Sequence, residues 1–255
     1  MIRKLVLLTF MTCSMAGHAQ ELSIAMTGDV MMGTTFPSTM LPANDGRYLF
    51  KDAKDILTRT DLTVGNLEGA ICDGGESTKG NGPNSYSFRT PTSYGHLLKE
   101  AGFDFMSMAN NHANDFGIEG IESTESVLDA QGILYSGIEG RIESAVIERK
   151  GLKIGLCAFG HNSYTLKHLD LETVGRIVDD LVAKCDLVIV SFHGGAEGTN
   201  QESPAQRPRD IPWRESWFVT PIGSLLRRSW SRCGLRTWPT CGSRHRGLQK
   251  PLHRL

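Results

Sequence analysis

Short β-prone runs alternate with stretches of helical periodicity, and this alternation constrains the fold more than any other feature of the chain. The expected strands are residues 22–27, 61–64, 103–108, 144–148, 152–159 and 186–192. The expected helices are residues 49–57, 93–101, 118–130 and 171–183. The turn at Arg149-Lys150-Gly151 predicts a hairpin between the two strands that flank it. The pattern predicts an α/β layered fold with a largely buried sheet.

Composition narrows the class of protein further. A hydrophobic content of 40% with 22% charged residues excludes wholesale disorder, collagen and a polytopic membrane protein. Residues 73–90 are rich in Gly, Ser and Asn, so we expect a long surface loop there, and it is a candidate to cover a site.

Four of the predicted strands end in side chains that can bind a metal. These side chains are Asp29; Asn66 and Glu68; Asn110, Asn111, His112 and Asp115; and His193 and Glu197. In open α/β sheets, ligands bind beyond the carboxyl ends of the strands. Carboxylate, carboxamide and imidazole groups together suit a divalent ion such as Mn²⁺, Zn²⁺ or Fe²⁺.

Each of these groups also has a purely structural interpretation. Asp29 could cap the next element, Glu68 could be a solvated loop acid, and the asparagines could provide turn chemistry. His112 and His193 could be structural histidines. Recurrence at four strand ends favours one shared polar site instead. His161, after another strand, is a weaker candidate to line it.

The two ends of the chain differ from its body. Residues 1–19 have basic residues, then an apolar run, then small residues, which is typical of a cleavable secretory signal and is too short to span a bilayer. Residues 207–255 hold 11 of the 27 Lys and Arg residues but only 2 of the 28 Asp and Glu residues. The body's cysteines, Cys72, Cys157 and Cys185, have no paired spacing, so we expect neither a disulfide framework nor a cysteine zinc site.

Four motifs, taken in order, carry a resemblance to a known family. They are residues 27–33, 64–69, 107–117 and 191–197. Together they resemble the bacterial poly-gamma-glutamate capsule-synthesis (CapA-type) family, a variant of the calcineurin-like metallophosphoesterases. The resemblance covers about residues 22–198, and we place the domain at residues 20–204. It implies a four-layer α/β/β/α sandwich around two metal ions.

The resemblance also implies roles for individual residues. Asp29, Glu68, Asn111 and His193 would be metal ligands, and His112 would be the acid that protonates a leaving group, oriented by Asp115. We further expect Asn66, Asn110 and Glu197 to bind substrate. Two metals would activate a water molecule and stabilise an oxyanion.

The chain departs from the family pattern in two places. Met31 stands where phosphoesterases have their second ligand, a histidine. The closing Gly-His-x-x-x-His-like motif is missing, although a one-base shift of the degenerate codons for residues 231–241 permits Gly-His-Gly-Pro-His. We therefore expect a frameshift that begins between about Thr199 and Ser229, which would make residues 205–255 an irregular, poorly packed tail. The sandwich would then be incomplete at its C-terminal end.

These observations predict an exported protein of the periplasm or cell envelope. We expect a metal-dependent hydrolase or transferase that acts on an anionic polymer such as poly-gamma-glutamate, or on a phosphoester, with activity impaired in this chain. Association with a membrane complex for capsule synthesis is a further expectation. The alternative is a non-catalytic envelope protein that assists polymer assembly or export. Nucleic-acid binding rests only on the basic tail and is not expected.

Overall fold

A computed structural model describes residues 21–80 and 85–194, together with the backbone of residues 216–221. The predicted signal at residues 1–19, Glu197 and most of the predicted tail lie outside these residues.

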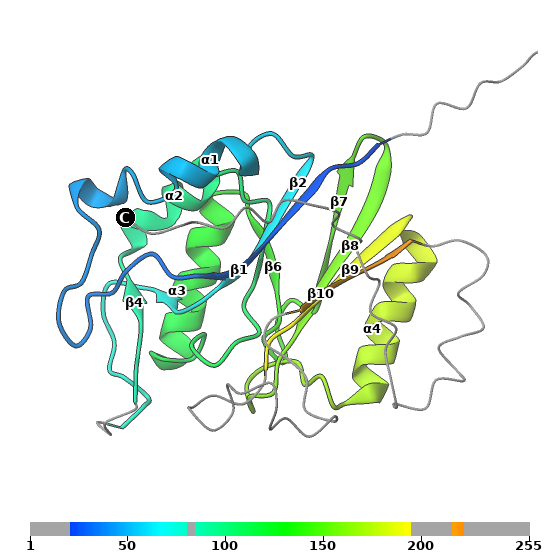
Figure 1. The fold of residues 1–255 in the computed structure, drawn as a ribbon. Helices are drawn as coiled ribbons and strands as arrows, with labels where there is room; N and C mark the ends of the chain where they lie inside the picture. Colours follow the sequence, from blue (N-terminus) through cyan, green and yellow to red (C-terminus); the bar gives the residue numbers. More distant parts are fainter. Residues whose placement is uncertain (1–20, 81–84, 195–215, 222–255) are drawn as a thin grey trace, which may run out of the picture. The chain divides into compact units, whose positions relative to one another are not determined.

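The first sheet is parallel throughout and has the strand order β1-β2-β5-β6 (Figure 1). Its strands are β1 (Ile24–Val30), β2 (Leu62–Leu67), β5 (Phe105–Ser107) and β6 (Leu134–Ser136). All six residues of β2 are buried, as expected for a central strand of a covered parallel sheet. A separate parallel pair, β3 (Ala70–Ile71) and β4 (Arg89–Thr90), joins the two ends of the loop that we predicted at residues 73–90.

The second sheet is mixed, with the strand order β10-β9-β8-β7. Its strands are β7 (Ser144–Arg149), β8 (Leu152–Phe159), β9 (Leu187–Phe192) and β10 (Ser216–Pro221). Strands β8 and β9 are parallel, while β7 and β10 run antiparallel to their neighbours. The predicted hairpin of β7 and β8 is confirmed. Its two turn residues, Lys150 and Gly151, have φ values of 50° and 71°, as a tight hairpin turn requires.

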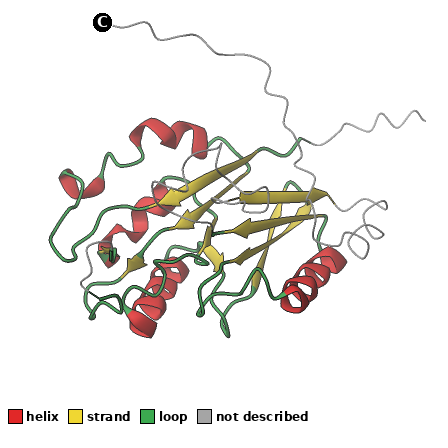
Figure 2. Ribbon diagram, turned by 60° about the horizontal axis from the view of Figure 1, so that its bottom comes forward, coloured by secondary structure: helices red, strands yellow, loops and turns green. Residues whose placement is uncertain are grey.

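Helices cover the outer faces of both sheets, which makes four layers (Figures 1 and 2). The helices are α1 (Lys51–Leu57), α2 (Gly95–Glu100), α3 (Gly117–Ala130) and α4 (Leu171–Lys184), with short 3₁₀ turns at Asn44–Gly46 and Thr92–Tyr94. Helices α1, α2 and α3 lie on the first sheet, and α4 packs on β8 and β9. Helix α4 begins where the Asp170 side chain accepts a hydrogen bond from the Thr173 backbone N–H, a typical N-cap.

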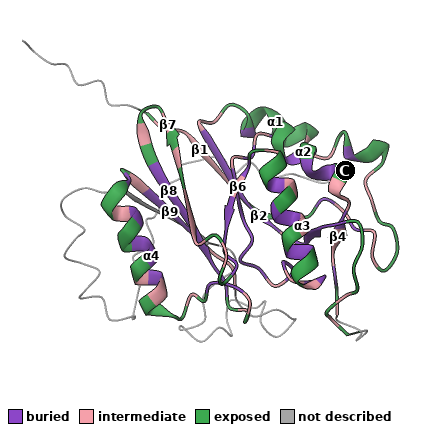
Figure 3. Cartoon of the chain, turned by 180° about the vertical axis from the view of Figure 1, so that it is seen from behind, coloured by how far each residue is buried: buried purple, intermediate pink, exposed green. Residues whose placement is uncertain are grey.

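Two of the apolar clusters formed by the described residues lie between the layers, where Figure 3 shows buried residues. One lies between the helices and the first sheet and includes Leu98, Met106 and Leu128. The other lies between the sheets and consists of Leu62, Val64, Phe105, Ile154, Leu156 and Ile189, none of which is measurably exposed. The layered α/β fold that the sequence predicts is therefore confirmed.

The structure differs from the sequence-based expectation in two places. We expected residues from about 205 onward to be irregular with isolated short elements, and the backbone of Ser216–Pro221 forms a short strand, β10, that pairs with the whole of β9 and extends the second sheet. Strand β6 and the short pair β3 and β4 were not predicted.

Candidate metal centre and the residues around it

The predicted site residues lie at the carboxyl ends of the parallel strands. Asp29 is the second-last residue of β1, Glu68 directly follows β2, and His193 directly follows β9. In the first sheet, Asp29 is in register with Asn66, and Asn66 is in register with Ser107 of β5. The parallel topology thus brings together groups that are more than 160 positions apart in the sequence.

Asp29, Glu68 and His193 form a group that could hold a metal ion. One ligand atom from each of the three lies within 4.8 Å of the other two. The Nδ1 atom of His193 is 3.8 Å from Oδ1 of Asp29. Two carboxylates and an imidazole are a donor set that Mn²⁺, Zn²⁺ or Fe²⁺ accepts. The structure brings these three residues together as we expected, and their metal binding stays a prediction.

Two buried amides orient the carboxylates. Nδ2 of Asn66 donates hydrogen bonds to Oδ1 of Asp29 at 2.6 Å and to Oε2 of Glu68 at 3.0 Å. Nδ2 of Asn110 in turn donates to Oδ1 of Asn66 at 3.0 Å and to the Leu67 carbonyl at 2.7 Å. Both asparagines are almost completely buried. In this structure their amides hold the protein's own groups, and their role in substrate binding stays a prediction.

Asn111 lies next to His193 and contacts its ring. Its Oδ1 atom is 2.7 Å from Nε2 of His193. When that nitrogen carries the proton and donates to Asn111, Nδ1 is left with its lone pair toward Asp29. Such hydrogen bonds to the second ring nitrogen fix the orientation of metal-binding histidines. Asn111 is therefore placed either to orient His193 or to share a metal with it.

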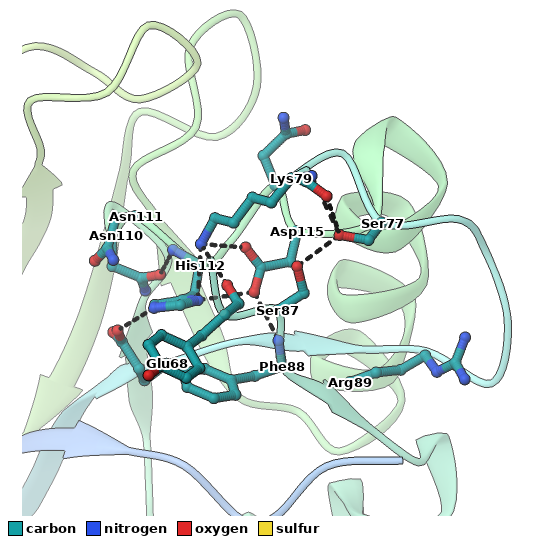
Figure 4. Close-up of polar contacts among 12 residues, drawn as sticks. Glu68, Ser77, Lys79, Ser87, Phe88, Arg89, Asn110, Asn111, His112 and Asp115 are labelled. Carbon is teal, nitrogen blue, oxygen red and sulfur yellow. Dashed lines mark hydrogen bonds and ion pairs between the residues drawn. The ribbon is translucent and has the colours of Figure 1, made fainter. Parts of the chain in front are cut away.

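His112 and Asp115 form a hydrogen-bonded pair next to this group (Figure 4). Nδ1 of His112 lies 2.8 Å from Oδ2 of the fully buried Asp115, which also accepts the backbone N–H of Phe88 at 2.7 Å. Nε2 of His112 lies 3.6 Å from Oε1 of Glu68. The ring therefore presents one nitrogen to a buried carboxylate and the other to the candidate metal group.

The loop at residues 73–90 supplies two site residues that the sequence analysis missed. The ring of Phe88 packs against His112 with centroids 4.3 Å apart. Nζ of Lys79 lies 2.7 Å from Oδ1 of Asp115 and 3.0 Å from Nδ1 of His112. The expectation that this loop covers a site was the only signal that pointed to either residue.

Tyr164 also contacts the site, by a hydrogen bond to a backbone carbonyl group. Its hydroxyl donates to the Asn110 carbonyl at 3.2 Å. Burial raises the pKa of this phenol, and the nearby Asp115 raises it further. Tyr164 is therefore a neutral donor at physiological pH.

Met31 and His161 lie at the margin of the site. Met31 is exposed, and its sulfur accepts the Gly33 backbone N–H at 3.1 Å. His161 is exposed, and its Nδ1 atom would lie 3.5 Å from a Cβ placed on Gly194, directly after His193. Its role in lining the site stays a prediction. None of the helices among the described residues is long and apolar enough to cross a membrane.

Residues 23–209 match the model of a family described as "Bacterial capsule synthesis protein PGA_cap". The capsule biosynthesis protein CapA of Bacillus anthracis is 23% identical over 205 residues, which are 73% of this chain and 50% of that protein. The PGA biosynthesis protein CapA of Bacillus subtilis is 23% identical over 201 residues, 73% of this chain and 52% of that protein. The chain spans about half the length of these two curated relatives.

Two solved structures are similar over 71% of this chain. A hypothetical protein from Thermus thermophilus is 22% identical, with a TM-score of 0.41 and 60% of its own chain covered. A phosphatase from Mycoplasma pneumoniae is 20% identical, with a TM-score of 0.40 and 57% covered.

Proposed function

The chain belongs to the bacterial capsule synthesis protein family PGA_cap, and from that premise we propose that it is an exported, metal-dependent hydrolase or transferase of the cell envelope. Its substrate is an anionic polymer such as poly-gamma-glutamate, or a phosphoester. The observation that carries the proposal is the convergence of Asp29, Glu68 and His193 beside the His112–Asp115 pair.

Each residue of the site has a separate role in the proposed reaction. Asp29, Glu68 and His193 would hold a divalent ion, whose chemistry is the activation of water and the stabilisation of an oxyanion. His112 donates a proton from Nε2 to the leaving group, and Asp115 holds Nδ1 so that the ring keeps its orientation. Asn66 keeps the two carboxylates at the separation seen here.

Metal analysis and hydrolysis of an aryl phosphate with Mn²⁺ test the proposal. Purified protein should bind Mn²⁺ or Zn²⁺, and Glu68→Ala should weaken binding, whereas Glu119→Ala on the exposed face of α3 should not. His112→Gln should retain metal and lose about 100- to 10,000-fold in kcat, which is the usual contribution of general acid catalysis. Unchanged metal binding and turnover in Glu68→Ala would refute the enzymatic proposal.

Met31 favours a second candidate function. Met31 stands at the position where phosphoesterases have their second metal ligand. Its thioether sulfur accepts a hydrogen bond from the backbone N–H of Gly33. A non-catalytic envelope protein that assists polymer assembly or export would keep the fold and tolerate this change. Binding of Mn²⁺ and of poly-gamma-glutamate without any turnover would select this alternative. Met31→His, if it created turnover, would identify the missing ligand as the cause.

We also propose that the sequence between about Thr199 and Ser229 passes into a shifted reading frame, which leaves the protein impaired. The support is the codon pattern of residues 231–241 and the change in charge after residue 206. The nucleotide sequence tests this directly, since an uninterrupted frame without the family motif in a neighbouring frame would contradict it. A frame-restored protein should have higher turnover than the chain as given.

A further inference from the structure

Arg89 is the first residue of β4, and its side chain extends away from His112, as Figure 4 shows. The preceding residue, Phe88, packs its ring against His112 instead. Neighbouring side chains of an extended chain point to opposite sides. The guanidinium group of Arg89 thus lies close to the candidate metal centre along the chain, but on a different side of this segment.

Two hydrogen bonds and two aromatic rings hold the guanidinium group of Arg89 in one place. Nε donates to the Thr35 hydroxyl at 3.0 Å, and Nη1 donates to the Gly75 carbonyl at 3.2 Å. Cζ lies 5.1 Å from the centre of the Phe116 ring and 5.6 Å from that of Phe36, close enough for cation–π attraction. This cation is therefore oriented before any ligand binds.

The positive charge of Arg89 has no ion-pair partner among the described residues. Asp73 is near enough to sense the charge, but its oxygens accept hydrogen bonds from Thr92, which are the main cause of its lowered pKa. Other described arginines do pair with a carboxylate, namely Arg59, Arg141, Arg149 and Arg176. Arg89 is thus a fixed cation that the described acids leave without a partner.

One edge of this guanidinium group is open to a ligand. Nη2 has no acceptor among the described residues, and it is not one of their buried atoms, so its N–H groups face solvent. A guanidinium group binds the oxygens of a carboxylate or a phosphate through neighbouring N–H groups. A cation that is held in place and has free donors is suited to bind such an anion.

We propose that Arg89 binds an anionic group of the substrate away from the bond that reacts. Because its side chain extends away from His112, the anion that it binds is not the group at the reacting bond. The substrate is therefore extended and carries several anionic groups, as poly-gamma-glutamate does, and a small phosphoester would not use this site. The proposal rests on the proposed function and narrows its substrate class.

The alternative is that Arg89 only braces the fold, since it joins Thr35 after β1 to Gly75 in the loop. Thr35→Val breaks this brace at Nε and leaves the cation in place. Arg89→Gln removes the cation. Arg47→Gln is the control for the loss of one positive charge, because Arg47 is exposed and also has no ion pair among the described residues.

Titration of the full-length protein with poly-gamma-glutamate in EDTA tests the proposal, since it needs neither a metal nor turnover. The wild-type protein and Arg47→Gln should bind with equal Kd. Arg89→Gln should raise the Kd by about 10- to 100-fold, the effect expected for losing hydrogen bonds between charged groups. Thr35→Val should bind more tightly than Arg89→Gln.

Several results would overturn the proposal. They are absence of polymer binding by the wild-type protein, an equal loss in Arg47→Gln, and an equal loss in Thr35→Val. Binding of inorganic phosphate that depends on Arg89, without binding of the polymer, would contradict the polymeric substrate. If Arg89→Gln does not fold, Arg89→Lys, which lacks the paired N–H groups, replaces it.

A separate titration with Mn²⁺ distinguishes failure of the proposed function from failure of this inference. Absence of Mn²⁺ binding by the wild-type protein would count against the proposed metal-dependent reaction. The polymer titration in EDTA would still decide whether Arg89 binds an extended anion.

Discussion

The side-chain amide of Asn66 donates to Asp29 at 2.6 Å and so ties a partly exposed carboxylate to the buried centre of the first sheet. The same nitrogen reaches Glu68 at 3.0 Å, so one amide sets the separation of two candidate ligands. Asn66, a buried residue of β2, thus fixes the positions of two candidate metal ligands.

Asn66→Ala should therefore lower the affinity for Mn²⁺ or Zn²⁺ by about 10- to 100-fold, as the loss of an outer hydrogen bond to a metal ligand usually does. Isothermal titration calorimetry measures the affinity. Thermal unfolding of the metal-free variant serves as the control for folding. An affinity equal to that of the wild-type protein would show that Asn66 does not orient the ligands.

Asp61 should make stability depend on pH. Hydrogen bonds from Lys150 and then from Ser23 hold the pKa of this carboxyl well below its usual range. Because the pKa is lowered in the folded state, the stabilisation is fully present above the unfolded pKa of about 3.9 and is lost as pH falls toward the folded pKa.

Urea unfolding at several pH values checks the sign of this effect. Asp61→Asn should have a lower free energy of unfolding than the wild-type protein at pH 7 and pH 5, and the difference should shrink below about pH 4. Asp52→Asn, on the exposed side of α1, is the control for removing one negative charge. A difference that grew as the pH fell would contradict the assignment.

Two arginine–glutamate pairs should differ in their contribution to stability. Arg141 donates from Nε to both oxygens of Glu125 at 2.7 Å, and the side chains are 30% and 10% exposed. Arg141→Met should cost about 3 kcal/mol, because it leaves a nearly buried carboxylate uncompensated. Arg176→Met, whose partner Glu143 is 39% exposed, should cost less than about 1 kcal/mol. Equal costs in urea unfolding would refute the assigned difference.

A side chain should be more destabilising at Gly137 than at Gly132. Its φ is +125°, and a Cβ would lie 2.7 Å from the backbone nitrogen of Ala109, directly before Asn110. Gly132 also has a positive φ, +62°, but a Cβ there would meet nothing within 4 Å. Gly132→Ala should therefore cost only about 1 kcal/mol of backbone strain. Gly137→Ala should cost about 1–3 kcal/mol more through overpacking and should also lower metal affinity, because the Asn110 segment must move.

Elements with a strong local signal were predictable from the sequence. The hairpin of β7 and β8 follows from two β-prone runs around Lys150 and Gly151, and α3 from apolar residues at helical spacing. Strand β6 was missed because three residues, Leu134–Ser136, are too few to show a period. Its identity as a strand depends on pairing with β5, which is a tertiary contact. The pairing of Ser216–Pro221 with β9 is non-local in the same way.

The sequence predicted the part of the site that lies at the carboxyl ends of the strands. Parallel neighbouring strands place their carboxyl ends at one edge of a sheet, so Asp29 and Glu68 could be grouped without knowing any distance. His193 follows a strand of the second sheet, and its grouping with them rested on the recurrence of polar residues at strand ends and on the family resemblance. The partners of these groups could not be found in this way. Lys79 is one lysine in a polar loop, 33 positions before His112, and no periodicity relates the two. Likewise, the bridge from Asn66 to both carboxylates depends on side-chain direction, which strand spacing alone does not determine.

The ligands of the candidate centre come from both sheets, with Asp29 and Glu68 on the first and His193 on the second. The apolar residues between the sheets, such as Val64, Phe105 and Leu156, therefore act as a spacer for chemistry at the strand ends. A slip of one residue along a strand is about 3.3 Å, comparable with the whole 4.8 Å span of the group. A change of volume in this spacer would therefore alter the distances among Asp29, Glu68 and His193 without substituting any of the three.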